Sequence, residues 1–308
     1  MRSKKRNNNG LKIFVSILAI LVIGILGYIY SIYANVKDSM DTAYTPVEVE
    51  TFRTSNTGTV ADSSEDEESR TNAGAMTPSE LLEAGEPVSI LLLGVDTGDL
   101  GRTEQGRSDS MVVVTINPHT QKTTLLSIPR DTYTEIVGYG TSDKINHAYA
   151  FGGTAMSINT VQQMLDIPID FYVMVNMAGI QEIVDAVGGI TVESPLTFNQ
   201  NGYDFVQGTN QLDGEAALAF ARMRYEDPAG DTGRQGRQRL VIEAVIRKLA
   251  TPETLLNYQT ILQSLSSNVQ TSFQLSDFYT LQSQDYLGAV DNMNQQQLGG
   301  TGGMMNEI

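Results

Sequence analysis

Five arginines are gathered between Phe220 and Leu240, and their side chains suit the binding of an anion. They are Arg222, Arg224, Arg234, Arg237 and Arg239. The whole chain has 20 lysines and arginines against 36 acidic residues, so its formal net charge is -16 and this stretch concentrates positive charge against the average. A guanidinium grips two oxygens of a phosphate or carboxylate at once and keeps its charge at physiological pH. The cluster predicts a site for a densely charged anion, with pairing to Glu226, Asp227 and Asp231 as the alternative.

Two helices are expected to position these arginines. Asp213 is a typical N-cap for a helix over residues 216–221, which places Arg222 and Arg224 at the exit of that helix. Proline and glycine in 228–233 discourage its continuation.

A second helix is expected over 236–250. Arg234 and Gln238 are four residues apart and can share one face near its beginning. The free N–H groups and the dipole at a helix N-terminus also favour an anion there. Two helices are therefore expected to converge on one group.

Carboxylates accompany arginine at a predicted sheet edge. Asp96 directly follows one apolar strand, and Arg107 and Asp109 precede the next, so a short loop could bring all three to the same end of the sheet. Mg²⁺, or Mn²⁺ in its place, is held by one or two carboxylates together with substrate oxygens. A role as a helix cap or turn residue is the alternative for each aspartate.

A third strand ends in Pro-Arg-Asp. Arg130 and Asp131 follow the predicted strand 123–128 at its carboxyl end, the edge where α/β sheets bind ligands. The sequence therefore predicts charged side chains at three strand ends, with Asp131 as a candidate general base.

Apolar runs bounded by turn residues indicate the secondary structure around these positions. Strands are expected at 88–95, 111–117, 123–128 and 171–176, with another beginning at 191, and helices at 154–165, 177–187, 236–250 and 252–265. Asn117 and Pro118 predict a hairpin between the second and third strands. Strands that alternate with helices predict an α/β fold, with a central mixed β-sheet flanked by helices.

The amino-terminal part predicts a membrane anchor. Residues 1–10 form a basic tail, and residues 11–34 are almost wholly apolar and long enough to span about 30 Å of hydrocarbon as a helix. The basic end is expected to stay in the cytoplasm, and everything after residue 34 to lie outside. A cleaved signal peptide is the alternative, but its apolar core is shorter and ends in a small-x-small cleavage site.

The remaining chain divides by composition. Residues 35–86 are polar and acidic and are expected to form a flexible extracellular tether. Residues 87–250 form the predicted catalytic domain, and 251–308 a helical carboxyl-terminal part with a glycine-rich tail. The chain has no cysteine, which excludes disulfides, thiol nucleophiles and thiolate metal sites. Its two histidines are not in a metal-ligand spacing.

Six short motifs occur in an order and spacing that extend over about 160 residues, from 88 to 250. They are Gly-Val-Asp at 94–96, Arg-Ser-Asp at 107–109, Ser-Ile-Pro-Arg-Asp at 127–131, Lys-Ile-Asn-His-Ala-Tyr at 144–149, Val-Gly-Gly-Ile at 187–190 and the arginine block at 220–238. Together they resemble the LytR-CpsA-Psr family. The resemblance implies a membrane-anchored extracellular phosphotransferase, which moves a glycopolymer such as teichoic acid or a capsular polysaccharide from polyprenyl pyrophosphate to peptidoglycan. Nothing in the sequence looks like a DNA-binding motif.

The resemblance also implies roles for individual residues. Asp96 and Asp109 match the metal-binding aspartates of the family. The residues that match its pyrophosphate-binding set are Arg107, Arg130, Arg222, Arg224, Arg234 and Gln238, and Lys144 stands in a motif of the resemblance as a further substrate-binding candidate. Segments 154–165 and 177–187 are candidate walls of a tunnel for the lipid tail, or ordinary core. The alternative function is that of a non-catalytic protein that binds lipid-linked wall glycan or scaffolds the cell envelope.

Overall fold

The computed structural model describes residues 34, 37, 41, 43–47, 76–96, 106–251, 254, 261, 268–283 and 285–303. The predicted anchor at 11–34 lies outside the described residues except for Ala34, and the predicted helix at 252–265 except for Thr254 and Ile261. Within the described ranges, no helix is long and apolar enough to cross a membrane.

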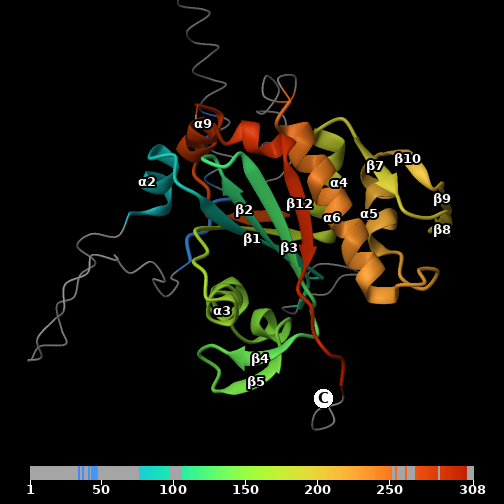
Figure 1. Cartoon of the computed structure of the whole chain (residues 1–308), viewed down its shortest axis with the longest axis horizontal. Coiled ribbons are helices and arrows are strands. Elements are labelled where there is room, and N and C mark those ends of the chain that lie inside the picture. Colours follow the sequence, from blue (N-terminus) through green and yellow to red (C-terminus); the bar gives the residue numbers. More distant parts are fainter. Residues whose placement is uncertain are drawn as a thin grey trace, which may run out of the picture.

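A mixed six-stranded sheet forms the centre of the domain, in the order β11-β6-β1-β2-β3-β12 (Figure 1). Its strands are β1 (Val88–Val95), β2 (Ser108–Asn117), β3 (Lys122–Ile128), β6 (Phe171–Asn176), β11 (Val269–Thr271) and β12 (Met293–Gln297). β1 is antiparallel to β2 and parallel to β6, while β2 and β3 form the hairpin predicted at Asn117. The α/β fold with a central mixed sheet flanked by helices is thus confirmed.

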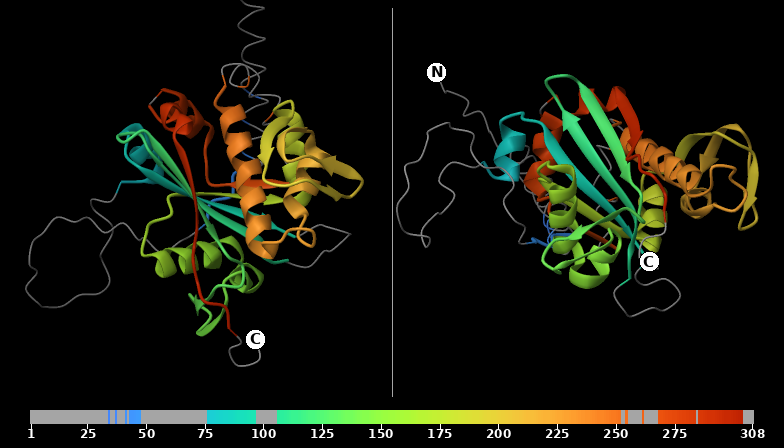
Figure 2. Two further views of the ribbon diagram at one scale, coloured as in Figure 1. Left: turned by 45° about the vertical axis from the view of Figure 1, so that its right-hand side comes forward. Right: turned by 60° about the horizontal axis from the view of Figure 1, so that its bottom comes forward.

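Helices cover both faces of this sheet (Figure 2). They are α2 (Pro78–Glu83), α3 (His147–Leu165), α4 (Met177–Ala186), α5 (Gly214–Arg222), α6 (Gly230–Leu249), α9 (Leu275–Ser283) and the 3₁₀ helix η2 (Leu287–Asp291). On one face, Ile158 and Val161 of α3 pack against β1 and β2 residues such as Leu93. On the other face, side chains from α2, α6 and α9 pack on Val112 and Leu125. The central strands are apolar throughout because both faces are buried.

A further apolar cluster lies beside the sheet and supports the arginine block. It joins α4, α5 and α6 to two small two-stranded sheets through residues such as Val184, Phe205 and Phe220. One of these sheets pairs β7 (Ile190–Ser194) with β10 (Gly208–Leu212), and the other pairs β8 (Phe198–Gln200) with β9 (Tyr203–Phe205). Asp213 caps α5 as predicted, because its side chain accepts a hydrogen bond from the backbone of Ala216. Arg222 is the last residue of this helix.

Two of the helices begin earlier than the sequence pattern predicts. α3 begins at His147 rather than 154, with non-helical backbone at Gly152 and Gly153. α6 begins at Gly230 rather than 236. Glycine is required at position 233 inside α6, because a Cβ there would collide with the Asp227 carboxylate. Both segments that were candidate tunnel walls, now in α3 and α4, contribute buried residues to the core clusters.

Parts of the predicted tether are packed against the domain. α2 begins with a capping box, in which Thr77 and Glu80 satisfy each other's backbone N–H groups, and it buries Leu81 and Leu82. Earlier in the chain, Tyr44 forms a β-bridge with Thr271. The packed part of the described chain therefore extends before the predicted boundary at residue 87.

The carboxyl-terminal segment contributes more than helices. β11 pairs with β6 and β12 pairs with β3, so residues after 268 form both edge strands of the sheet. Neither strand was expected. In β12, Met-Asn-Gln-Gln-Gln lacks the β-branched and aromatic residues typical of strands. The strand conformation of β12 comes from its pairing with β3 and not from its local sequence.

Candidate functional site

The ends of three neighbouring strands meet at one edge of the sheet. Because β1, β2 and β3 are consecutive and antiparallel, the carboxyl ends of β1 and β3 lie beside the amino end of β2. Asp96 follows β1 and sits opposite Arg107, whose backbone N–H donates to Asp96 Oδ1 at 2.6 Å. The predicted charged residues at 96, 109 and 130 are thus placed at the same edge.

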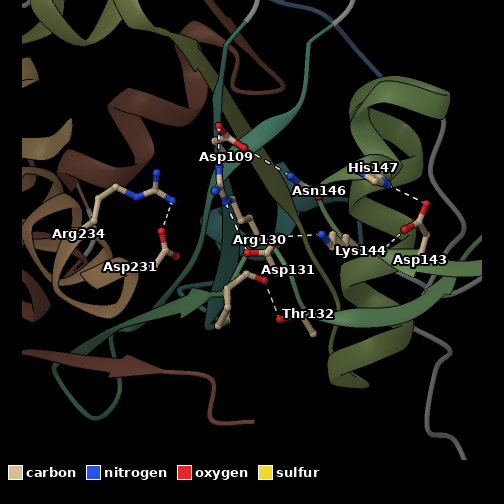
Figure 3. Close-up of polar contacts among 11 residues, drawn as sticks. Asp109, Arg130, Asp131, Thr132, Asp143, Lys144, Asn146, His147, Asp231 and Arg234 are labelled. Atoms are coloured by element: carbon tan, nitrogen blue, oxygen red, sulfur yellow. Dashed lines mark hydrogen bonds and ion pairs between the residues drawn. The ribbon is translucent and has the colours of Figure 1, made fainter. Parts of the chain in front are cut away.

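Asp109 is the extra residue of a β-bulge. Gly94 pairs with Ser110 and Val95 pairs with Ser108, so no residue of β1 stands opposite Asp109. A bulge re-aims the side chain of the inserted residue, and such bulges are enriched next to active sites. Asp109 Oδ2 lies 3.1 Å from Arg130 Nη1, and Oδ1 accepts a hydrogen bond of 3.4 Å from Asn146 (Figure 3).

Arg130 is a charged side chain that has one hydrogen-bond donor left unused. Its Nε is buried and has no hydrogen-bond partner in the part of the chain that the structure describes. Burial opposes its charge, but the neighbouring carboxylates, Asp109 first among them, outweigh this and raise the pKa of Arg130 above its ordinary value. The guanidinium therefore stays ionised and can still donate to a ligand.

Asp131 and Lys144 continue the charged row away from Arg130. Asp131 lies 3.7 Å from Arg130 Nε through one oxygen and 3.7 Å from Lys144 Nζ through the other. Lys144 is the last residue of β5 (Thr141–Lys144), which forms a hairpin with β4 (Tyr133–Ile136). The side chain of Asp131 is 57% exposed, so an incoming group can reach it. Its role as a general base stays a prediction.

Arg234 approaches the same space from α6 (Figure 3). Its Nη2 lies 2.6 Å from Asp231, to which Arg224 is also close at 3.9 Å. Burial lowers the pKa of Arg234, and the positive charges of Arg130 and Arg224 act in the same direction against the effect of Asp231. Arg234 Nε is buried without a hydrogen-bond partner among the described residues. α6 and the sheet edge thus present two partly buried guanidinium groups to one region.

The other predicted substrate-binding residues are carried by α5, by α6 and by the residue before β2. Arg222 is exposed at the end of α5, and Gln238 is half-buried one turn after Arg234 in α6. The exposed Arg107 meets the centre through its backbone bond to Asp96.

Arg237 is a structural residue, although it lies in the same block. It is fully buried and paired with Asp227, and its Nε donates to the carbonyl oxygen of Phe220 at 3.1 Å. Its Nη2 donates to the carbonyl oxygen of Met223, and its guanidinium lies over the ring of Phe198. The alternative of pairing within the block is therefore correct for Arg237, which fastens α5 and the following turn to α6.

Two further polar residues of this region were given no individual role from the sequence. Asn146 is buried and donates to Asp109, while its own Oδ1 has no hydrogen-bond partner within the described residues. Arg239 of α6 donates to Ser127 at 2.8 Å, and its buried Nε likewise has no partner in the described chain. Burial lowers the pKa of Arg239. Both had a sequence signal, since Arg239 belongs to the arginine cluster and Asn146 stands in the motif at 144–149.

The oxygen donors at the sheet edge fit a magnesium ion. Asp96 and Asp109 offer carboxylates, and the unpartnered Oδ1 of Asn146 offers a third hard oxygen. No group of three or more His, Cys, Asp or Glu side chains that could hold a metal occurs among the residues described. Mg²⁺ is typically bound by one or two carboxylates with substrate phosphates completing its shell, so a set of this size is sufficient.

Comparison with known proteins identifies the class of protein to which this fold and site belong. Residues 49–308 match the LytR_cpsA_psr family, and the chain belongs to this family.

Similar proteins in the family include wall polymer transferases. The chain is 44% identical over 304 residues to an Enterococcus faecalis protein named polyisoprenyl-teichoic acid–peptidoglycan teichoic acid transferase TagU, which covers 98% of this chain and 92% of that protein. The crystal structure of B. subtilis TagU is similar with a TM-score of 0.58 and 43% identity, over 71% of this chain and 87% of that one. A structure described as TagT bound to LIIa-WTA has a TM-score of 0.62 and 30% identity, over 77% and 86% of the two chains.

Proposed function

We propose that this chain is a phosphotransferase that moves a teichoic acid or related glycopolymer from a polyprenyl pyrophosphate carrier to peptidoglycan. The observation that supports it most directly is that Arg130 and Arg234 each have a buried Nε atom with no hydrogen-bond partner in the described chain. Buried polar groups are normally hydrogen-bonded, so these donors are suited to a ligand rich in acceptors, such as a pyrophosphate. The names of the relatives supply the substrate class.

In the reaction we propose, a peptidoglycan sugar hydroxyl attacks the phosphorus that bears the glycan. The bond from that phosphorus to the bridging oxygen breaks, and polyprenyl phosphate leaves with the electron pair. Arg130 and Arg234 donate to the pyrophosphate oxygens as charge develops, and fixed donors of this kind need little rearrangement during the reaction. Asp131 is the candidate acceptor of the hydroxyl proton, because it is exposed beside Arg130.

Asp96 and Asp109 would hold the Mg²⁺ or Mn²⁺ ion, with Asn146 beside Asp109. A bound ion supplies neutralisation of negative charge on the pyrophosphate. The chain's own part is to hold Asp109 in place, which the bulge in β2 and the contacts to Arg130 and Asn146 achieve.

We further propose that residues 11–34 anchor the protein in the cell membrane as a single span, with the amino terminus in the cytoplasm and residues 87–250 outside. The basic residues before this apolar run favour that orientation. The catalytic domain would then face the outer leaflet, where a lipid-linked donor and the wall acceptor are both within reach. Protease added to intact protoplasts should digest residues 87–250, and their survival while an external control is cut would contradict this topology.

An in vitro transfer assay with lipid-linked glycan and peptidoglycan fragments tests the activity. We expect Arg130→Ala and Arg234→Ala to lose transfer, while Arg247→Ala keeps it, because Arg247 pairs with Glu243 in a later, partly exposed part of α6. Wild-type rates in the first two variants would refute the assignment.

The alternative, a protein that binds lipid-linked glycan without reacting with it, needs the same arginines. Asp96→Ala and Asp109→Ala distinguish the two functions when turnover and lipid affinity are measured together. A transferase loses turnover and retains lipid affinity, whereas a binding protein has no turnover to lose.

A further inference from the structure

Two aromatic rings are stacked on the surface beside the charged site. Tyr139 and Phe151 have ring centroids 4.0 Å apart and planes within 11° of each other. Tyr139 is 51% exposed and Phe151 is 38% exposed, so neither ring belongs to the core. The His147 ring lies 5.7 Å from Phe151 in a tilted arrangement. Stacked aromatic rings that stay in water are a marker of a binding surface.

The backbone around these rings is built to hold them there. Tyr139 lies in the turn of the β4–β5 hairpin between Gly138 and Gly140, both of which have positive φ, a conformation that glycine adopts readily. The N–H of Val137 donates to the side chain of Thr160 in α3, which ties the hairpin to that helix. Phe151 lies in the first turns of α3, directly before the two glycines where the helix is interrupted. The pair therefore has a fixed place on the surface.

A continuous series of contacts joins this pair to the arginine site. In order from the site, the residues are Arg130, Asp131, Lys144, Asp143, His147, Phe151 and Tyr139. The Lys144 N–H donates to Asp143 at 2.7 Å, and the other Asp143 oxygen is 2.7 Å from His147 Nδ1 (Figure 3). The series begins with charged groups, continues through hydrogen-bonding groups and ends in aromatic rings.

We propose that Tyr139 and Phe151, with Asp143 and His147 at their edge, form a subsite for a sugar ring of the acceptor glycan. A pyranose ring has an apolar C–H face that packs on an aromatic surface, and hydroxyls at its rim that need polar partners. The aromatic pair supplies the surface for the C–H face, and the Asp143–His147 pair supplies polar partners for the hydroxyls. The inference rests on the proposed transfer reaction, because the acceptor must bind beside the anion site for one of its hydroxyls to reach the phosphorus.

The charges around the pair favour a glycan over a membrane surface. Between Tyr133 and Phe151 the chain has two acidic residues, Glu135 and Asp143, and a single lysine, Lys144. Lys144 is already close to Asp131. Surfaces that bind anionic lipid combine aromatic residues with an excess of lysine and arginine, which is lacking here. An uncharged, hydroxyl-rich ring is the better complement.

Steady-state transfer by the full-length chain tests this subsite. We expect Tyr139→Ala and Phe151→Ala each to raise the KM for peptidoglycan fragments by about tenfold, with the KM for the lipid-linked donor unchanged. Phe151→Tyr should restore the acceptor KM. Tyr279→Ala is the matched control, because Tyr279 is a similarly exposed aromatic residue in α9, away from the hairpin (Figure 1). An unchanged acceptor KM in correctly folded variants would overturn the proposal, whereas absence of transfer by the wild type would overturn the proposed function.

A binding measurement separates the two without any turnover. The chain has no tryptophan, so Phe151→Trp introduces a single fluorescent reporter at the subsite. Titration with peptidoglycan fragments alone should change its emission, and Tyr139→Ala in the same chain should weaken this response about tenfold. A response to anionic phospholipid vesicles and none to the glycan would refute the glycan subsite in favour of membrane contact.

Discussion

Two arginine–carboxylate pairs in this molecule have the same chemistry and opposite surroundings. The Arg237–Asp227 pair is closed, with side-chain exposures of 0% and 3%, while the Arg130–Asp109 pair is open, at 23% and 29%. Every nitrogen of Arg237 donates to a carboxylate or a backbone carbonyl. Arg130, by contrast, has a buried Nε without a hydrogen-bond partner among the described residues. The spare donor, rather than the residue type, distinguishes a ligand-binding arginine from a structural one.

The largest expected effect is on stability, through the closed pair. Arg237→Met should lower the free energy of unfolding by about 3–5 kcal/mol, because it leaves Asp227 buried without a counter-charge. Urea unfolding of the purified chain measures this. Arg247→Met removes the partly exposed pair with Glu243 and should cost less than about 1 kcal/mol. Equal losses in the two variants would contradict the distinction between closed and open pairs.

The next effect is on activity, through the open pair. Arg130→Ala should reduce kcat for transfer by about 10²–10³-fold, the usual result of removing one fixed donor from a developing negative charge. Its urea midpoint should stay close to that of the wild type, because Asp109 retains contact with solvent and with Asn146. Arg130→Lys should recover only part of the rate, since lysine lacks the planar fork. A large loss of stability with little loss of rate would reverse the comparison.

A smaller effect is expected from pH. Burial opposes the charge on Asp227, but hydrogen bonds from Arg237 and the Ala229 backbone outweigh it and hold its pKa below the ordinary 3.8. The stabilisation from this group is therefore complete above its unfolded pKa and is lost as the pH falls through the lower folded pKa. Over that acid window the wild type should lose up to about 1.4 kcal/mol per pH unit more than the variant Asp227→Leu/Arg237→Met. Acid unfolding curves of equal slope would exclude this contribution.

The smallest effect is expected from that same double variant at neutral pH. Replacing both members of a buried pair with apolar residues of similar volume is often neutral, because the desolvation cost of the charges disappears with their attraction. The free energy of unfolding should therefore lie much closer to the wild type than that of Arg237→Met alone. A loss as large as in the single variant would show that the carbonyl contacts of Arg237, rather than its charge pair, hold α5 to α6.

The sequence predicted the central strands and the sheet edge well, because both depend on local patterns. The apolar run of β1 and the hairpin at Asn117 leave little choice of topology, and they determine which strand ends meet. The sequence did not predict which arginines of the block bind the ligand and which one is structural. Arg234 and Arg237 are three residues apart, and only the path of the turn through Asp227 decides which becomes buried.

Long-range pairing explains the other omissions. β12 is a run of glutamines whose strand conformation comes from β3, and Asn146 becomes a site residue only through its contact with Asp109, 37 positions earlier. The aromatic pair joins a hairpin turn to a helix in the same way. Patterns within a short window contain no information about such partners.

Both edge strands of the central sheet are synthesised after its four inner strands. Until residues 269–297 are available, β6 and β3 each have an unpaired edge, and β1 and β2 lie between two incomplete neighbours. An open edge is a template for pairing with another chain. The protein must therefore pass through a stage at which most of its core residues are present while its sheet remains open to aggregation, and a chain interrupted before residue 269 would stay in that state.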